Sequence, residues 1–363
     1  MDSRTRVKLA LQHREPDRVP IDFWASSGCI RSIERATGRT YAEFLDEHDV
    51  DLRYIEGPGY IGPALERRAD GCDRDIWGVL RRPVSVQVAH GLEQYMEVAE
   101  SPLAAADSVA EVEAYAGWPS ADWFDYSAIA AQCEAVHRAG RAAVFMGDRL
   151  NRVAQLKPAM YLRGVERILM DMVQRPEMAH AVLGRISQFY GEYEERILTA
   201  ARGQLDILLT GDDFGSQAGP LVSPRMWAEF LGRGFADYCA IARRHGVSVM
   251  HHTCGSVRAL VPLLIERGLD VLQSLQPEAA GMDHRALKAE YGQRLGFHGG
   301  ISIQRTLPFG TPEQVAWEVQ ERIAALAPGG GYILGTAHNI QADTPPENIA
   351  ALLTAYHEFG RYT

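Results

Sequence analysis

The chain has 363 residues, of which 46% are hydrophobic and 23% charged, the composition of an ordinary globular protein that can bury a large core. Its net charge of −10, from 47 acidic against 37 basic residues, provides no field that would attract a phosphate backbone or an anionic lipid surface. We therefore expect neither nucleic acid nor a membrane as a partner.

The N-terminal stretch MDSRTRVKLALQHREPDRVP carries charges throughout and lacks the continuous apolar core of a secretory signal. No later run reaches the roughly 18 apolar residues of a membrane span. The five cysteines are odd in number and scattered, which does not describe a disulfide framework. We expect a cytoplasmic protein whose thiols are mostly reduced.

Short β-like runs alternate with longer stretches of helical periodicity along the chain. The predicted strands are residues 18–24, 51–57, 142–148, 206–213, 247–253, 270–276, 295–301 and 332–338. Amphipathic segments separate most of them, which implies parallel pairing through right-handed crossovers. Eight such units predict an α/β protein with a (β/α)8 TIM barrel. A doubly wound sheet fits less well, because no G-x-G-x-x-G follows the first strand.

We expect a single domain over residues 1–363, since no long linker, low-complexity segment or repeat interrupts the pattern. Residues from about 72 to 102 break the rhythm. They alternate like a β-hairpin and indicate an insertion after the second strand. This insertion either covers the barrel mouth or a partner surface, or is a purely structural flap.

Polar residues close nearly every predicted strand. The chemistry of a barrel gathers at the carboxyl ends of its strands, so these residues are the candidates for a site. Any single one of them could equally be a helix cap or a solvated loop residue. They are Asp22, Glu56, Asp148, Asp212, Asp213, His252, Cys254, Gln276, Glu278, His298, His338 and Asn339.

The stretch VMHHTCGS at the end of the fifth strand carries the sharpest signal. Residues two apart point to the same side of a strand, so His252 and Cys254 project together while His251 faces away. An imidazole and a thiolate suit Zn²⁺, and His338 at the end of the last strand is the best third ligand, leaving a fourth position open for substrate. A Cys–His nucleophile pair, or a buried thiol beside a hydrogen-bonded histidine, would use the same residues.

The acidic candidates have several roles open to them. Alternation lets only one of Asp212 and Asp213 face the cavity, and we favour Asp213 as a hydrogen-bond acceptor, general base or metal ligand. Either aspartate could instead cap the helix that begins near Ser223. Glu56 and Glu278 are predicted to be acceptors in the cavity, or partners that orient a ligand histidine.

Taken together, these residues lie in a chain that resembles the uroporphyrinogen decarboxylase superfamily over nearly its whole length. The resemblance is carried by HREPDRVPIDFW, GDDFGSQAGPLVSPRMWAEF, HGVSVMHHTCGSVRALVPLLIERGLDVLQSLQP, LGFHGGISIQ and GGGYILGTAHNIQADTPPENIAALL. It implies a (β/α)8 barrel and, because barrels of this superfamily often pair, a homodimer. The superfamily has two well-known functional branches.

The decarboxylases of haem biosynthesis work without a cofactor and grip the carboxylates of a porphyrinogen through an arginine-bearing RQAGR loop after the first strand. The corresponding stretch here, FWASSGCIRSIERATG, lacks that motif, and its first arginine is Arg31. Glu56 corresponds to the aspartate that binds the pyrrole N–H groups in these enzymes. His338 corresponds to their histidine near the C-terminus.

The methyltransferases of the superfamily move methyl groups between corrinoid carriers and thiols such as coenzyme M. They hold zinc through a His-x-Cys pair and a third ligand, usually cysteine. The pair matches His252 and Cys254, and the third ligand falls on His338. The resemblance thus implies a zinc ion that lowers the pKa of a substrate thiol, and a corrinoid that is usually carried on a separate protein.

We therefore predict a zinc-dependent methyltransferase or demethylase acting between a corrinoid carrier and a thiol or other small acceptor. The predicted metal ligands are His252, Cys254 and His338, and the catalytic candidates are Glu56, Asp213 and His338. Two alternatives stay open. One is a cofactor-free decarboxylase with Glu56 and His338 in its site, and the other is a non-catalytic barrel that binds a corrinoid or another small molecule.

Overall fold

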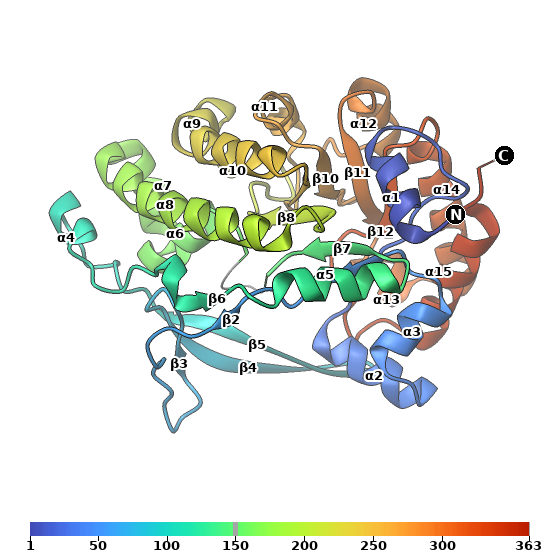
Figure 1. Ribbon diagram of the computed structural model, residues 1–363, viewed down its shortest axis with the longest axis horizontal. Helices are drawn as coiled ribbons and strands as arrows, with labels where there is room; N and C mark the ends of the chain where they lie inside the picture. The colour runs from blue at the N-terminus through green and yellow to red at the C-terminus, as the bar shows by residue number, and fades with distance from the viewer. Residues whose placement is uncertain (148–151, 363) are drawn as a thin grey trace.

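A sheet of seven parallel strands organises the fold in the computed structural model, which describes residues 1–147 and 152–362 (Figure 1). Neighbouring strands are hydrogen-bonded in parallel throughout this sheet. They match the second to eighth predicted strands, which confirms the alternating βα pattern there. In spatial order they are β1 (Leu52–Tyr54), β7 (Ala142–Phe145), β8 (Ile207–Gly211), β9 (Ser248–His252), β10 (Val271–Ser274), β11 (Gly296–Ile301) and β12 (Tyr332–Thr336).

The sheet curls around an inner core. Leu52 of β1, Leu209 of β8, Met250 of β9 and Ile333 of β12 share one buried cluster, although β1 and β12 stand at opposite ends of the strand order. Residues of the other parity pack outward beneath the helices. Because Met250 points into the curl, His252 two residues later does so as well, at the carboxyl end of the strand.

The first predicted strand, residues 18–24, is not part of this sheet. It runs between β12 and β1 and makes isolated parallel bridges, Ile21 to Leu334 and Ala25 to Ile340. The backbone N–H of Ile21 donates to a side-chain oxygen of Asp51 at 2.8 Å, and Pro20 has no N–H, so a regular ladder cannot form. The described sheet therefore has seven strands where eight were predicted, and closure into an eight-stranded barrel stays a prediction.

Helices surround the strands on the outer face of the sheet (Figure 1). Their sequences carry ordinary start signals: Thr311 and Gln314, for example, form a reciprocal capping box at the start of one of them. The helices are α1 (Ser3–Leu11), α2 (Ser27–Thr37), α3 (Tyr41–Glu47), α4 (Val109–Glu113), α5 (Ile129–Arg138), α6 (Leu156–Arg163), α7 (Val165–Gln174), α8 (Pro176–Ala201), α9 (Pro224–Phe230), α10 (Gly232–Arg244), α11 (Val261–Glu266), α12 (His284–Tyr291), α13 (Thr306–Phe309), α14 (Pro312–Leu326) and α15 (Pro346–Phe359). None of the helices in the described ranges has both the length and the apolarity to cross a bilayer.

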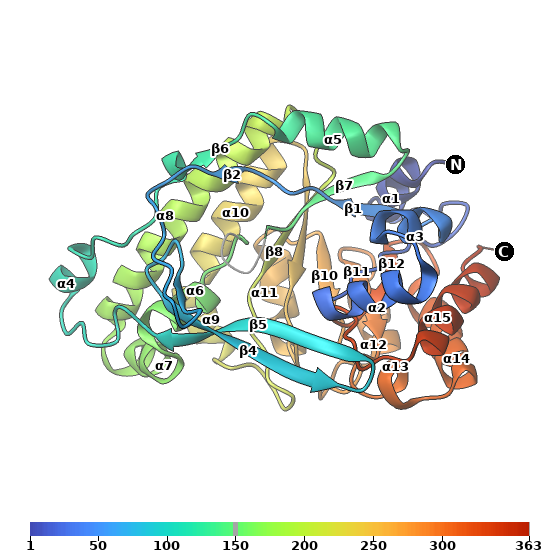
Figure 2. The same ribbon diagram turned by 90° about the horizontal axis from the view of Figure 1, so that it is seen from below.

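The alternating segment after β1 forms a separate antiparallel sheet of β3 (Asp73–Arg74), β4 (Leu80–Val88) and β5 (Gly91–Glu100). The β4–β5 hairpin runs along one side of the molecule toward α2 (Figure 2). Its tip is fastened there, because the Glu93 carboxylate accepts hydrogen bonds from Ser26 Oγ at 2.5 Å and from the Ala342 N–H at 2.8 Å. A small antiparallel pair, β2 (Gly59–Tyr60) and β6 (Phe124–Asp125), completes the strands of the described ranges.

Candidate metal centre

Three potential metal ligands converge at the carboxyl end of the curled sheet. His252 is the last residue of β9, Cys254 follows it, and His338 lies just beyond β12. Their donor atoms all lie within 4.8 Å of one another, and Cys254 Sγ is 3.4 Å from His252 Nε2. In tetrahedral zinc coordination a sulfur at about 2.3 Å and a nitrogen at about 2.0–2.1 Å are roughly 3.5 Å apart. The donor types and their spacing therefore fit zinc.

Hydrogen bonds orient both imidazoles toward the centre of this group. The Nδ1 of His252 is 2.6 Å from Gln273 Oε1, and the Nδ1 of His338 bonds Asn339 Oδ1. An amide oxygen only accepts, so each Nδ1 carries the proton and each Nε2 keeps its lone pair. Partners of this kind commonly hold metal-binding histidines in one tautomer.

Replacing Gln273 with alanine is expected to weaken zinc binding by about 10- to 100-fold, because His252 then loses the acceptor that fixes its ring and tautomer. The change should be measured as a zinc dissociation constant by competition with a chelator of known affinity. Gln273→Glu, which keeps an acceptor oxygen at the same position, should retain most of the affinity. Equal affinities for wild type and Gln273→Ala would show that this contact does not support the ligand.

The donor group is buried enough to be uncharged in the absence of a cation. Burial raises the pKa of the Cys254 thiol to about 12. Burial, and then the proximity of His338, lowers the pKa of His252 well below its ordinary value, and burial also lowers the pKa of His338. Two neutral imidazoles and a thiol are the state from which a metal ion would displace one proton, from the sulfur.

A cavity of about 270 Å³ opens beside these ligands. Trp24 forms one wall. Its ring stacks on His338 with centroids 5.2 Å apart, and the Arg152 guanidinium lies 5.7 Å from the centroid of the Trp24 ring. Lys157 brings a second cationic side chain to the lining. The full lining is Trp24, Met146, Arg152, Ala154, Lys157, Pro158, Gly211, His252, His338 and Asn339.

Asp213 connects the cationic wall to the ligands. Its carboxylate lies 2.6 Å from Lys157 Nζ, accepts the Cys254 N–H at 3.1 Å, and is 3.7 Å from His252 Nε2. Burial opposes ionisation, but the Lys157 ammonium and the Cys254 N–H outweigh it and hold the pKa of Asp213 well below its usual range. So low a pKa makes Asp213 a weak base, and the contacts assign it a positioning role.

Asp212 does not face the cavity, and its side chain binds backbone N–H groups instead. It is buried and accepts the N–H groups of Gln155, Leu156 and Lys157 at 2.6, 3.0 and 2.6 Å. These N–H groups at the start of α6 have no partner within the helix, and no residue of the helix itself supplies a side-chain cap. Asp212 thus fixes the helix that carries Lys157.

The remaining predicted strand-end residues lie elsewhere. Glu56 is exposed and does not line the cavity, so its predicted place there is not met. The chain turns away after Ile55: Gly57 adopts φ +83° and exchanges two backbone hydrogen bonds with the Gln132 side chain. Asp148 falls outside the described residues.

The other polar strand ends satisfy local hydrogen bonds. Asp22 pairs with His298 at 2.9 Å inside the curl, and Gln276 accepts the Gly255 N–H at 3.0 Å. Glu278 bonds Ser302. His251 faces outward, as alternation predicts, and stacks on Phe214 with centroids 5.0 Å apart.

Three residues of the site were not identified from the sequence: the cavity residues Arg152 and Lys157, and Gln273, which bonds His252. Gln273 could have been found by parity, because it pairs with His252 in the register of β9 and β10. Arg152 and Lys157 follow the third strand in a stretch whose path no local pattern predicts.

The family comparison now applies to this geometry. A family model described as uroporphyrinogen decarboxylase (URO-D) matches residues 153–359, more than half of the chain and most of the residues just described. The chain belongs to the uroporphyrinogen decarboxylase family. Among curated relatives, the uroporphyrinogen decarboxylase of Herminiimonas arsenicoxydans is 30% identical over 100 residues, covering 26% of this chain and 27% of that protein. That of Anaeromyxobacter dehalogenans is 27% identical over 203 residues, covering 54% and 53%.

The chain thus spans between about a quarter and a half of the length of these curated family relatives. A solved structure described as a methyltransferase from Methanosarcina mazei superposes over 99% of both chains with a TM-score of 0.69 and 16% sequence identity. At that identity the superposition shows a shared fold. This uroporphyrinogen decarboxylase family member therefore shares its α/β architecture with a protein described as a methyltransferase.

Proposed function

We propose that this chain is a zinc-dependent methyltransferase or demethylase that moves a methyl group between a corrinoid carrier and a thiol or other small acceptor. The observation that carries the proposal is the convergence of His252, Cys254 and His338, with the Cys254 sulfur 3.4 Å from His252 Nε2 and the Nδ1 of each imidazole hydrogen-bonded to an amide oxygen. The structural relative described as a methyltransferase supports the same choice within the family. We place the site in a (β/α)8 barrel in which residues 18–24 supply the remaining strand, between β12 and β1.

Zinc held by these three residues would supply a Lewis acid that lowers the pKa of a substrate thiol and favours its nucleophilic thiolate form. The chain's own residues prepare the site for this. Gln273 and Asn339 keep both imidazoles in the ligand tautomer, and Asp213 holds the backbone at Cys254. The cavity beside the ligands is where the acceptor would bind.

The cavity wall favours an acceptor that also carries an anionic group. Arg152 and Lys157 both line it, and Asp213 pairs with Lys157 at 2.6 Å. A cation beside a cavity of about 270 Å³ would orient a small acid such as a mercapto-carboxylate or mercapto-sulfonate. The Trp24 ring, which stacks on the ligand His338 and lies 5.7 Å from the Arg152 guanidinium, gives the acceptor an apolar surface between the charge and the ligands.

Methyl transfer from methylcobalamin to a panel of small thiols tests the proposal directly. We expect zinc-loaded protein to convert methylcobalamin in the presence of a thiol acid, followed by the absorbance change of the corrinoid and by mass spectrometry of the thioether. His252→Ala should lose the activity by at least about 100-fold, because one ligand is gone. Thioether formation that is independent of zinc and of His252 would contradict the mechanism.

Cofactor-free decarboxylation is the second candidate, because the curated relatives within the family are uroporphyrinogen decarboxylases. The residues that correspond to the carboxylate-binding loop argue against it. Arg31 is exposed, and its guanidinium donates to the Leu92 carbonyl at 2.8 Å on the hairpin, so it does not line the cavity. Turnover of uroporphyrinogen by metal-free protein would favour this candidate. Corrinoid binding without turnover of any acceptor would favour a binding function.

A further inference from the structure

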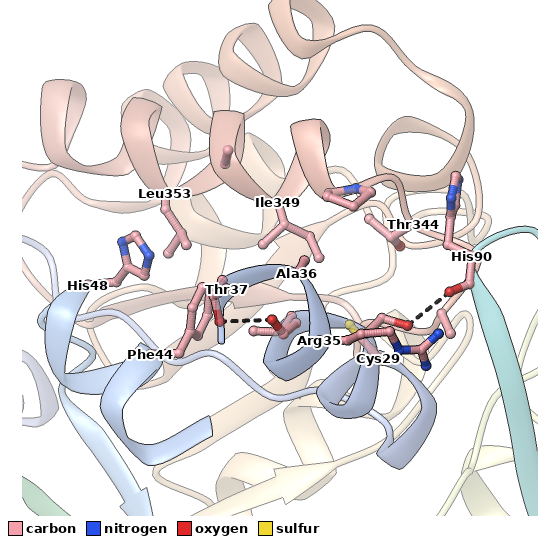
Figure 3. A pocket seen from close by; sticks show the side chains of 15 residues that line it. Cys29, Arg35, Ala36, Thr37, Phe44, His48, His90, Thr344, Ile349 and Leu353 are labelled. Carbon is pink, nitrogen blue, oxygen red and sulfur yellow. Dashed lines mark hydrogen bonds between the residues drawn. The ribbon is translucent and has the colours of Figure 1, made fainter. Parts of the chain in front are cut away.

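A second cavity, of about 530 Å³, lies between α15 on one side and α2 and α3 on the other (Figure 3). It shares no lining residue with the cavity at the metal centre. The tip of the β4–β5 hairpin closes one end through His90. Its lining is Cys29, Ser32, Ile33, Arg35, Ala36, Thr37, Phe44, His48, His90, Ala342, Thr344, Pro346, Ile349, Ala350 and Leu353.

The body of this cavity is apolar. Phe44 lies across from Ile349 and Leu353 of α15 (Figure 3). Ile33 of α2 also lines the cavity, and all four side chains belong to the hydrophobic core and are at least nine-tenths buried. The volume falls in the range of about 300–1,000 Å³ that accommodates single small organic molecules. An apolar chain or ring would gain the hydrophobic contribution of this surface.

The ionisable side chains at the rim of the cavity are basic ones. Arg35, His48 and His90 line the cavity, and no carboxylate does so among the described residues, although the whole chain carries a net charge of −10. Arg35 is exposed and makes no ion pair within the described part of the chain. An anion near Arg35 would thus meet a guanidinium that no ion pair of the described residues engages, while two acids close to the lining, Glu93 and Asp343, act on Cys29 and His90.

The guanidinium of Arg35 lies at one end of the cavity (Figure 3). Ser32, one helical turn before Arg35, donates its hydroxyl to the His90 carbonyl at 2.9 Å, so Arg35 and His90 flank the same end. His48 is drawn at the other end (Figure 3). Burial, and then the charges of His357 and Arg39, lowers the pKa of His48, which leaves that end neutral near pH 7.

We propose that this cavity binds a small amphipathic organic anion, with its apolar chain or ring between α15 and the α2–α3 pair and its carboxylate, sulfonate or phosphate facing Arg35. The combination of a buried apolar body, a guanidinium without an ion pair at one end and a lining that contains no carboxylate among the described residues carries the proposal. It does not depend on the proposed methyl transfer, because the two cavities have separate linings.

Calorimetric titration with octanoate, and with octanamide as a neutral molecule of the same shape, tests this site. We expect one octanoate per chain, bound at least about tenfold more tightly than octanamide. Arg35→Gln should remove that preference and leave octanamide binding unchanged. Arg31→Gln, which removes a charge from the same helix outside the cavity, should leave both affinities unchanged.

Blocking the cavity provides the second arm. Ala350 and Ala36 are exposed residues of the lining, so Ala350→Trp or Ala36→Trp fills the space without entering the core, and each should abolish octanoate binding. Octanoate binding that persists in both folded tryptophan variants would overturn the proposal. Equal affinity for octanoate and octanamide would overturn it as well, and so would a dimer in sedimentation that must dissociate before octanoate binds.

Discussion

Cys254→Ala is expected to yield protein that no longer holds stoichiometric zinc and no longer transfers methyl groups. Zinc sites with four ligands bind with about 10–16 kcal/mol, so removal of one strong ligand should weaken affinity by about 100- to 1,000-fold. The two histidines left behind, His252 and His338, cannot compensate, because Cys254 is the anionic donor of the set. Zinc per chain, measured by mass spectrometry of the metal after dialysis, should fall from about one to below about a tenth.

Matched variants separate this expectation from a general loss of structure. Cys72→Ala removes a thiol from the insertion, away from the donor group, and should keep full zinc content. His338→Cys substitutes another zinc-competent donor and should retain the metal. If His338 were needed for acid–base chemistry instead, this substitution would abolish the activity. Replacing zinc with cobalt adds a thiolate-to-metal charge-transfer absorption, which Cys254→Ala should remove. Unchanged zinc affinity in Cys254→Ala would show that the metal centre is wrongly placed.

Asp212→Ala is expected to lower the free energy of unfolding by about 3–5 kcal/mol. The Asp212 carboxylate is 2% exposed and accepts three backbone N–H groups at the start of α6. Without the carboxylate these buried N–H groups lose their acceptor, and each loss lowers the free energy of unfolding by about 1–3 kcal/mol. Water that enters the space replaces these hydrogen bonds only in part. Urea unfolding followed by circular dichroism measures the change.

The neighbouring aspartate is the control for this stability prediction. Asp213 accepts a single backbone N–H, from Cys254, and its side chain is 33% exposed, so Asp213→Ala should cost only about 1 kcal/mol of stability. It should nevertheless reduce methyl transfer, since it frees Lys157 and the loop at Cys254. Equal losses of unfolding free energy in the two variants would show that the cap that Asp212 provides for α6 does not stabilise the fold more than the single hydrogen bond of Asp213.

Local periodicity was sufficient for most of the architecture. Short apolar runs separated by amphipathic segments predict parallel βα units, and the structure confirms seven of the eight strands. The first strand failed for a reason that acts across the chain: Asp51, 30 residues beyond Ile21, takes the N–H that a ladder would need. The candidate metal ligands lie at the carboxyl ends of the strands, where the strand pattern predicts a site.

The same two-residue periodicity placed His252 and Cys254 on one side of their strand and His251 on the other. It failed at Glu56, because the strand ends before that residue and the turn at Gly57, tied to Gln132, directs the chain outward. Alternation thus held two residues beyond β9, at Cys254, and failed two residues beyond β1, at Glu56, because it requires a backbone that stays extended.

The amino-acid sequence by itself determined the βα alternation, the insertion near residues 72–102, and the pairing of His252 with Cys254, because each depends on residues that are neighbours along the chain. Only the tertiary structure decided that His338 lies near this pair, that Gln273 orients His252, and that Asp212 caps a helix 55–57 residues away. These contacts arise where separate strands end at a common edge, and the distances across that edge follow from the curl and register of the whole sheet.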